Sequence, residues 1–81
     1  MVRVTFYHKA GCWLCDTVEE TLNGLRDKYG LAVVKMAIDT DEKLYALYRY
    51  DIPVLEFDDG TTLHGRIRKQ KLLKALEANR E

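Results

Sequence analysis

Residues 5–15 read TFYHKAGCWLC, and this stretch holds the only two cysteines of the 81-residue chain, Cys12 and Cys15. The stretch begins in a predicted strand, because apolar and polar residues alternate over residues 2–7. It ends in a predicted helix over residues 12–29, where apolar side chains recur at helical spacing. The two cysteines therefore lie at a junction between a strand and a helix, about one helical turn apart.

The place of Cys12 in the first turn of this helix predicts a reactive thiol. A thiolate reacts and a thiol does not, so a reactive cysteine needs surroundings that lower its pKa from the free value of about 8.5. The positive end of a helix dipole provides such surroundings. Cys15 lies close enough to attack a mixed disulfide formed on Cys12. The pair is therefore predicted to form a reversible disulfide.

Other interpretations of the Cys-X-X-Cys pair are less favoured. A purely structural disulfide would close so short a loop that it would remove little entropy from the unfolded chain. A zinc ion or an iron cluster normally takes four protein ligands, and only His8 and His64 are available to help the two cysteines. Two inert cysteines remain an alternative. Redox activity is favoured, since this motif at a strand-to-helix junction is typical of cytosolic redox sites.

Length and composition predict one globular domain over residues 1–81. The chain is 47% hydrophobic and contains few glycines and one proline, which argues against disorder. No apolar run approaches the roughly 18 residues of a membrane helix, and the first residues show no apolar core of a signal peptide. We therefore expect a cytoplasmic protein with no membrane partner, and a reducing compartment favours a transient disulfide over a permanent one.

The formal net charge is zero, but basic residues gather toward the C-terminus: Arg66, Arg68, Lys69, Lys71 and Lys74. Such a cluster can mark a nucleic-acid-binding surface. No aromatic residue is interleaved with these charges. We therefore interpret them as a solvated helix face and expect no nucleic-acid partner.

The middle of the chain continues an alternation of strands and helices. Strands are predicted over residues 31–38 and 54–57. A helix between them is capped near Asp41 and ends before Pro53. A turn at residues 58–60 is typical of a hairpin.

A fourth strand and a last helix complete the pattern. The strand is predicted over residues 61–63, and the helix carries Ile67, Leu72, Leu73 and Leu76 on one face. The order βαβαββα predicts an α/β fold with a four-stranded mixed sheet, its first two strands parallel, its last two antiparallel, and helices on both faces. This is the arrangement of the minimal thioredoxin fold. The tyrosines expected to pack in its core are Tyr29, Tyr45, Tyr48 and Tyr50.

Three motifs together resemble one known family. Residues 7–16 (YHKAGCWLCD), 52–55 (IPVL) and 63–66 (LHGR) are similar to those of the small glutaredoxin-like family within the thioredoxin superfamily. The resemblance covers essentially the whole chain. It implies a dithiol-disulfide oxidoreductase in which Cys12 is the nucleophile and Cys15 is the resolving thiol.

The resemblance also implies residues that bind the substrate. It places Pro53 in a cis peptide bond beside the cysteines, where the backbone of Ile52 can pair with the main chain of a substrate. It matches Lys9 to a lysine that faces a glutathione carboxylate. Trp13, expected to be exposed beside the nucleophile, is a candidate contact for a partner protein.

Departures from the better characterised glutaredoxins bear on the substrate. Those proteins carry Cys-Pro-Tyr-Cys, whereas Trp13 and Leu14 stand between the cysteines here. The acidic or hydroxyl pair that holds the glutamyl ammonium of glutathione is replaced by Arg66, Ile67 and Arg68. We therefore predict that protein disulfides are favoured over glutathione mixed disulfides.

The expected partners are a disulfide-containing protein substrate and an unidentified reductase, with glutathione as a further candidate. We expect a monomer without a cofactor or a metal site. The alternative is a non-catalytic module of the same fold that binds metal or a bridging iron–sulfur cluster through Cys12. His8 is interpreted as a surface residue near a loop and His64 as a strand residue.

Overall fold

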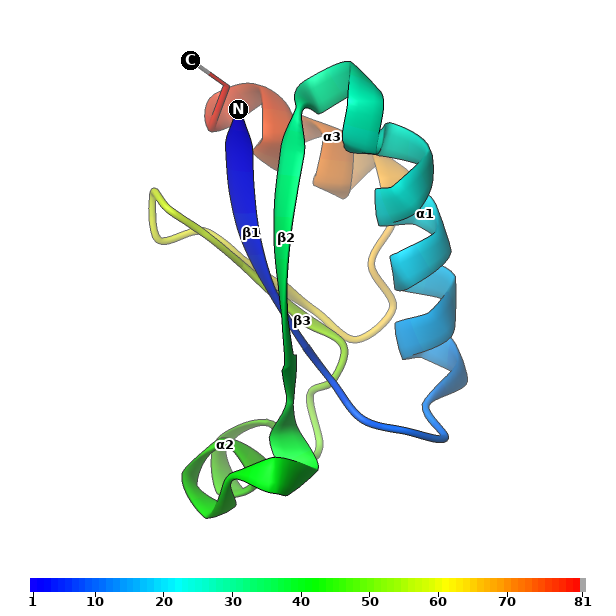
Figure 1. The fold of residues 1–81 in the computed structure, drawn as a ribbon, viewed down its shortest axis with the longest axis vertical. Helices are drawn as coiled ribbons and strands as arrows, with labels where there is room; N and C mark the ends of the chain where they lie inside the picture. The colour runs from blue at the N-terminus through cyan, green and yellow to red at the C-terminus, as the bar shows by residue number, and fades with distance from the viewer. Residues whose placement is uncertain (81) are drawn as a thin grey trace.

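The computed structural model describes residues 1–80, and its elements follow the predicted order (Figure 1). The strands are β1 (Val2–His8), β2 (Leu31–Ala37), β3 (Val54–Phe57) and β4 (Thr62–His64). The helices are α1 (Trp13–Tyr29), α2 (Glu42–Tyr48) and α3 (Lys69–Ala78), and a short 3₁₀ turn, η1 (Ile38–Thr40), precedes α2. Within residues 1–80 no helix has the length and apolar character needed to span a membrane.

The four strands form one mixed sheet in the order β2-β1-β3-β4. β1 pairs in parallel with β2, with Val2 opposite Leu31. β1 pairs in antiparallel fashion with β3, with Tyr7 opposite Val54, and β4 is antiparallel to β3. The predicted α/β fold with a four-stranded mixed sheet is confirmed. This topology brings the end of β1 and the start of β3 to the same edge.

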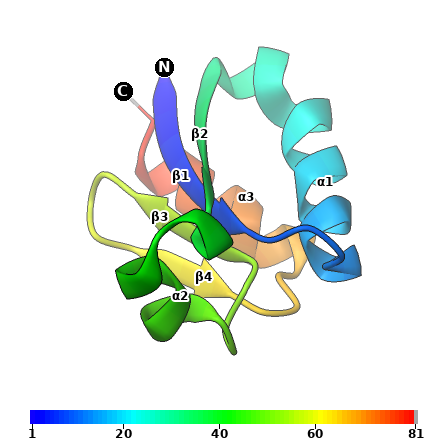
Figure 2. The same cartoon turned by 60° about the horizontal axis from the view of Figure 1, so that its bottom comes forward.

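One face of the sheet packs against α1 and α3 to form the hydrophobic core. Alternate residues of a strand point to the same face, and Val2, Val4 and Phe6 of β1 are all buried. Leu22 of α1 and Leu76 of α3 belong to the same buried cluster. Figures 1 and 2 show both helices on this side of the sheet. The core therefore fixes the start of α1 relative to the sheet.

The opposite face of the sheet is covered by α2 only near one end. The ring of Tyr48 in α2 stacks on Tyr7 of β1, with centroids 4.5 Å apart. The Tyr7 hydroxyl donates a hydrogen bond to the Glu56 carboxylate at 3.2 Å. On the same face, Val34 and Met36 of β2 are exposed, and Met36 is the residue of β2 that pairs with Tyr7. The helix thus lies near the edge where β1 ends, at the bottom of Figure 1.

The tyrosines divide into two groups, and the expectation that all four pack in the core is wrong for two of them. Tyr29 is buried and Tyr48 is half-buried. Tyr45 is exposed, and Tyr50 is 84% exposed. The physical reason is the short length of α2, which leaves its outer face and the following loop without a covering element. Arg49 lies over both exposed rings instead, at 5.7 and 4.6 Å from the centroids.

Several predicted boundaries differ from the structure by a residue or so. The second strand ends at Ala37, because the chain turns into η1, whose Ile38 stays fully buried. The fourth strand begins and ends one residue later than predicted, at Thr62 and His64. Ile67 packs against the core from the loop before α3 rather than from the helix itself.

Candidate redox site

Cys12 is the N-cap of α1, so the helix begins one residue later than predicted. Its backbone is extended, and its sulfur accepts a hydrogen bond from the amide of Cys15 at 3.1 Å. Its carbonyl accepts the first backbone hydrogen bond of the helix, from the amide of Asp16 at 3.1 Å. An N-cap side chain satisfies amides that the helix cannot pair itself. The Cys12 sulfur therefore lies at the positive end of α1.

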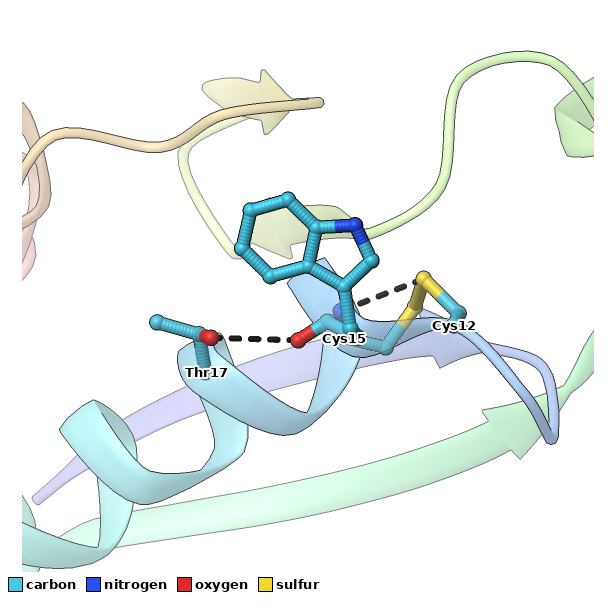
Figure 3. The surroundings of a disulfide bond; sticks show 4 residues. Cys12, Cys15 and Thr17 are labelled. Atoms are coloured by element: carbon cyan, nitrogen blue, oxygen red, sulfur yellow. Dashed lines mark hydrogen bonds between the residues drawn. A yellow bond between two sulfur atoms is a disulfide. The ribbon is translucent and has the colours of Figure 1, made fainter.

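A disulfide joins Cys12 to Cys15 across 5.2 Å between the Cα atoms (Figure 3). Cys12 is half-buried, whereas Cys15 is only 3% exposed and belongs to the core cluster. A reagent from solvent therefore reaches the Cys12 sulfur more readily than the Cys15 sulfur. In Figure 3 the hydroxyl of Thr17 donates to the main-chain oxygen of Trp13 at 3.1 Å, within the first turn.

Trp13 lies between the cysteines with its side chain in solvent, as predicted. It is 64% exposed, although it is a large apolar residue. The guanidinium of Arg66 lies over its ring, 5.7 Å from the centroid. This contact connects the start of α1 with the loop between β4 and α3.

The Ile52–Pro53 peptide bond is cis, as the resemblance implied. Pro53 is buried, and its carbonyl accepts a hydrogen bond from the Gly65 amide at 2.9 Å. The same amide lies 3.0 Å from the carbonyl of Asp51. Gly65 has a φ of +69°, which a residue without a Cβ adopts readily. The loop therefore holds Pro53 through Gly65 and touches Trp13 through the next residue, Arg66.

The strand register places the proline at the same edge of the sheet as the cysteines. Tyr7 pairs with Val54, so the residue before Val54 lies beside the end of β1. The segment 9–11 then leads directly from β1 into Cys12. The cysteine segment and the Pro53 segment thus lie at the same edge of the sheet. The loop at Gly65 and Arg66 contacts both, through Pro53 and Trp13.

Ile52 and Lys9 remain predicted substrate contacts. Ile52 is half-buried, and its amide donates to the Tyr48 carbonyl at 3.1 Å, so within the protein this amide is already paired. Lys9 is half-buried between β1 and Cys12. Within residues 1–80 no carboxylate pairs with its ammonium. An anionic substrate group could therefore approach this ammonium without displacing an ion pair.

The two histidines lie where the sequence predicted, one beside a loop and one in a strand. His64 is an exposed residue of β4, as predicted. His8 is the last residue of β1, next to the loop as predicted, and is half-buried, with its ring centroid 5.2 Å from that of Phe6. In the described part of the chain, no three or more His, Cys, Asp or Glu side chains lie close enough together to hold a metal ion.

Tyr7 and Glu56 form a polar pair beneath this edge of the sheet, and neither was singled out from the sequence as part of the site. Burial and the neighbouring Glu56 carboxylate raise the pKa of Tyr7 to about 12. The tyrosine is therefore neutral at physiological pH and donates to the carboxylate. The pairing could not be foreseen from the sequence, because it joins residues that are 49 positions apart.

Arg66, Arg68 and Lys71 line a surface hollow of about 440 Å³ between β4 and α3. The sequence suggested that these residues belong to a solvated helix face. In the structure Arg66 and Arg68 precede α3, and only Lys71 lies in it. The loop before α3 brings Arg66 over the ring of Trp13, which residue spacing alone did not indicate. We call this the basic hollow.

Known proteins resemble this chain both in sequence and in structure. A family model described as Glutaredoxin-like domain (DUF836) matches residues 3–77. The structure of a structural-genomics target protein from X. campestris is 31% identical, covers 93% of this chain and 96% of that one, and superposes with a TM-score of 0.79. The structure of protein Ne2328 from Nitrosomonas europaea is 25% identical, covers 91% and 88%, and has a TM-score of 0.73.

A more distant likeness concerns the fold alone. Thioredoxin O1 from Arabidopsis thaliana, in its oxidised state, is 20% identical over 100% of this chain and 79% of that one, with a TM-score of 0.79. The predicted thioredoxin-type fold is therefore confirmed. Together with a Cys-X-X-Cys pair at disulfide distance, the fold and the family model indicate a redox-type thiol function.

Proposed function

Because this chain belongs to the glutaredoxin-like domain family (DUF836), we propose that it is a thiol-disulfide oxidoreductase that reduces protein disulfides through Cys12 and Cys15. One observation carries the proposal. A half-buried cysteine caps the start of a helix, and a buried cysteine one turn later is bonded to it. This arrangement gives one sulfur that a substrate can reach and one that can resolve the product.

The reaction begins at the reduced pair. The Cys12 thiolate attacks one sulfur of the substrate disulfide, a bond forms between the two sulfurs, and the second substrate sulfur leaves as a thiolate that takes up a proton. Cys15 then loses its proton and attacks the Cys12 sulfur. The bond between Cys12 and the first substrate sulfur breaks, this sulfur leaves as a thiolate that takes up a proton, and the Cys12–Cys15 disulfide remains. The substrate has gained two electrons and two protons, which the dithiol of a reductase returns to this protein.

The residues around the pair assist these steps by position. The amide of Cys15 and the end of α1 stabilise negative charge on the Cys12 sulfur. The exposed ring of Trp13 offers apolar area to a protein partner. The carbonyl of Ile52 would accept a hydrogen bond from a substrate backbone, since the Ile52 amide is already bonded to the Tyr48 carbonyl. These features suit a polypeptide held beside the disulfide.

Charge favours proteins over glutathione as the substrate. Glutathione carries an ammonium group as well as two carboxylates, and a charge left unpaired in a binding site is costly. Lys9 could meet one carboxylate. Arg66 and Arg68 follow Gly65, where a glutathione site of this fold would need an acceptor for the ammonium. We therefore expect glutathione to be a weak substrate and a weak reductant.

The test compares two sources of electrons for the oxidised protein. We expect a thioredoxin reductase or dithiothreitol to reduce it efficiently, and glutathione with glutathione reductase to reduce it slowly. In a protein-disulfide assay, Cys12→Ser should be inactive. Cys15→Ser should accumulate a mixed disulfide with the substrate, visible by mass spectrometry and released by dithiothreitol.

Two results would contradict the proposal. Efficient glutathione-dependent turnover by the Cys15→Ser variant would show that Cys12 alone suffices and that glutathione is the true partner. A coloured protein that holds iron and loses it in Cys12→Ser, with no disulfide reduction, would favour a cluster-binding module instead.

A further inference from the structure

We infer that the basic hollow docks an acidic segment of the protein substrate next to the redox pair. This inference names a substrate class and rests on the function proposed above. The three cations Arg66, Arg68 and Lys71 line the hollow together with the half-buried apolar residues Leu63 and Ile67. A volume of about 440 Å³ accommodates a few side chains of a partner.

The cations of the hollow have no counter-charge within the described protein. The ion pairs found over residues 1–80 join Arg3 to Asp58, Lys35 to Glu19, and Arg80 to Glu77. None of them involves a residue of the hollow. Like charges gathered on one surface repel each other, so this arrangement does not serve the stability of the isolated fold.

The start of α3 adds to this local excess of positive charge. Its first turn holds no acidic residue, and no side chain caps it. Cations near the N-terminus of a helix are unfavourable, because that end carries partial positive charge. Arg68 and Lys71 nevertheless occupy this place. Since the chain as a whole has a net charge of zero, the attraction for an anion is local to this surface.

The hollow adjoins the redox pair. Arg66 lines the hollow and lies over the exposed ring of Trp13, which stands directly after Cys12. Figures 1 and 2 both show the yellow-orange segment between β4 and α3 passing beside α1. A chain whose acidic residues occupy the hollow would therefore lie within a few residues of the Cys12 sulfur. Charge complementarity of this kind sets orientation and association rate more than overall affinity.

An acidic polypeptide fits these features better than a nucleic acid. Binding of single strands relies on aromatic side chains on which successive bases stack. The lining of the hollow contains no Phe, Tyr or Trp, and the neighbouring ring of Trp13 already has the Arg66 guanidinium over it. The surface also continues into a thiol site whose reaction partner must carry a disulfide.

The experiment uses three disulfide-bonded peptides of equal length, with Glu, Gln or Lys at the positions flanking the cysteines. We expect kcat/KM for the Glu peptide to exceed that for the Gln peptide by about three- to tenfold at low salt. The Lys peptide should be the slowest. At about 1 M salt, where screening acts over roughly 3 Å, the three values should converge.

The variant Arg68→Gln/Lys71→Gln isolates the hollow from the redox pair. We expect it to bring the Glu-to-Gln ratio close to one. The matched control Lys28→Gln/Lys43→Gln removes the same charge from exposed sites elsewhere and should keep the ratio of the wild-type protein. Both variants are checked for folding by circular dichroism. A ratio unchanged in Arg68→Gln/Lys71→Gln would overturn the inference.

The outcomes separate this inference from the proposed function. If all three peptides are reduced at equal rates at low salt, the docking surface is wrong while the redox activity stands. If none of them is reduced by a freshly reduced protein, the proposed function itself fails. Strong inhibition by a single-stranded oligonucleotide, without a preference for the Glu peptide, would assign the hollow to nucleic acid and overturn the inference.

Discussion

The amide of Cys15 donates a hydrogen bond to the sulfur of Cys12, at 3.1 Å from nitrogen to sulfur. Cys12 is the last residue of the extended segment, and Cys15 lies in the first turn of the helix. One cysteine thus supplies the backbone donor and the other the acceptor. We expect the same donor to face the Cys12 sulfur after reduction, where it would bind a thiolate more strongly than a thiol.

This asymmetry predicts that Cys12 is the more reactive thiol of the reduced protein. Iodoacetamide at pH 7 should label Cys12 first, by about tenfold or more, because Cys15 is buried and lacks the position at the end of the helix. Peptide mapping by mass spectrometry after brief exposure gives the ratio. Labelling in denaturant is the control and should be equal. Preferential labelling of Cys15 in the folded protein would reverse the assigned roles.

Two glycines, one inside α1 and one that ends it, predict opposite effects of substitution by alanine on stability. Gly30 ends the helix with a φ of +60°, and its amide donates to the Arg26 carbonyl. Gly30→Ala should lower the free energy of unfolding by about 1–2 kcal/mol, since an L side chain disfavours this conformation. Gly24 is an exposed residue inside the helix, and an added Cβ meets no atom within 4 Å. Gly24→Ala should raise the free energy of unfolding by about 0.5–1 kcal/mol.

Urea unfolding followed by circular dichroism measures both glycine variants. The pair is its own control, because each variant adds one methyl group near the same helix. A destabilised Gly24→Ala variant or an unaffected Gly30→Ala variant would contradict the assigned roles of the two residues.

Local patterns were enough to predict most of the fold. Alternation marked β1, and Gly30 and Asp41 are residues with strong local preferences at the end and the start of a helix. Their effects act over one turn, so the sequence displays them directly. Exposure at Tyr50 and Leu47 could not be predicted in this way, because burial depends on which elements lie above α2.

The candidate site was predictable in its cysteines, in the exposure of Trp13 and, by resemblance, in the cis bond before Pro53, but not in the contacts that join these parts. Cys12 and Cys15 lie in one short motif, so their relationship is local. The Gly65–Arg66 loop joins Pro53 to Trp13 only after the sheet has formed. Contacts of this kind depend on topology, and residue spacing does not record them.

Burial predicts very different effects of alanine substitution at two leucines on the free energy of unfolding. Leu76 of α3 is fully buried within the main cluster, whereas Leu47 of α2 is 65% exposed. Leu76→Ala should lower the free energy of unfolding by about 2–5 kcal/mol, because it removes buried area and leaves a cavity. Leu47→Ala should change it by about 0.5 kcal/mol or less. Urea denaturation at neutral pH compares the two, and equal losses would contradict the described position of α2.

The raised pKa of Tyr7 predicts that the folded protein loses stability at alkaline pH. Its pKa is raised from 10.0 to about 12 in the folded protein, first by burial and then by the Glu56 carboxylate that accepts its hydrogen bond. Between these two values the unfolded chain releases the tyrosine proton before the folded chain does. The contribution of Tyr7 is therefore fully present below pH 10 and is lost as the pH rises toward 12. The loss by pH 11 is about 1 kcal/mol, since solvent screening of this partly exposed group reduces the full linkage value.

Urea unfolding at pH 9 and pH 11 tests this contribution. The wild-type protein should lose more stability between the two values than Tyr7→Phe, which has no phenol to ionise. Tyr50→Phe is the matched control, because that ring is 84% exposed, and it should lose as much as the wild-type protein. Glu56→Gln removes the charge that opposes ionisation of Tyr7, so its phenolate absorbance should appear at a lower pH than in the wild-type protein. Equal losses in the wild-type protein and Tyr7→Phe would mean that the Tyr7–Glu56 pair does not couple folding to pH.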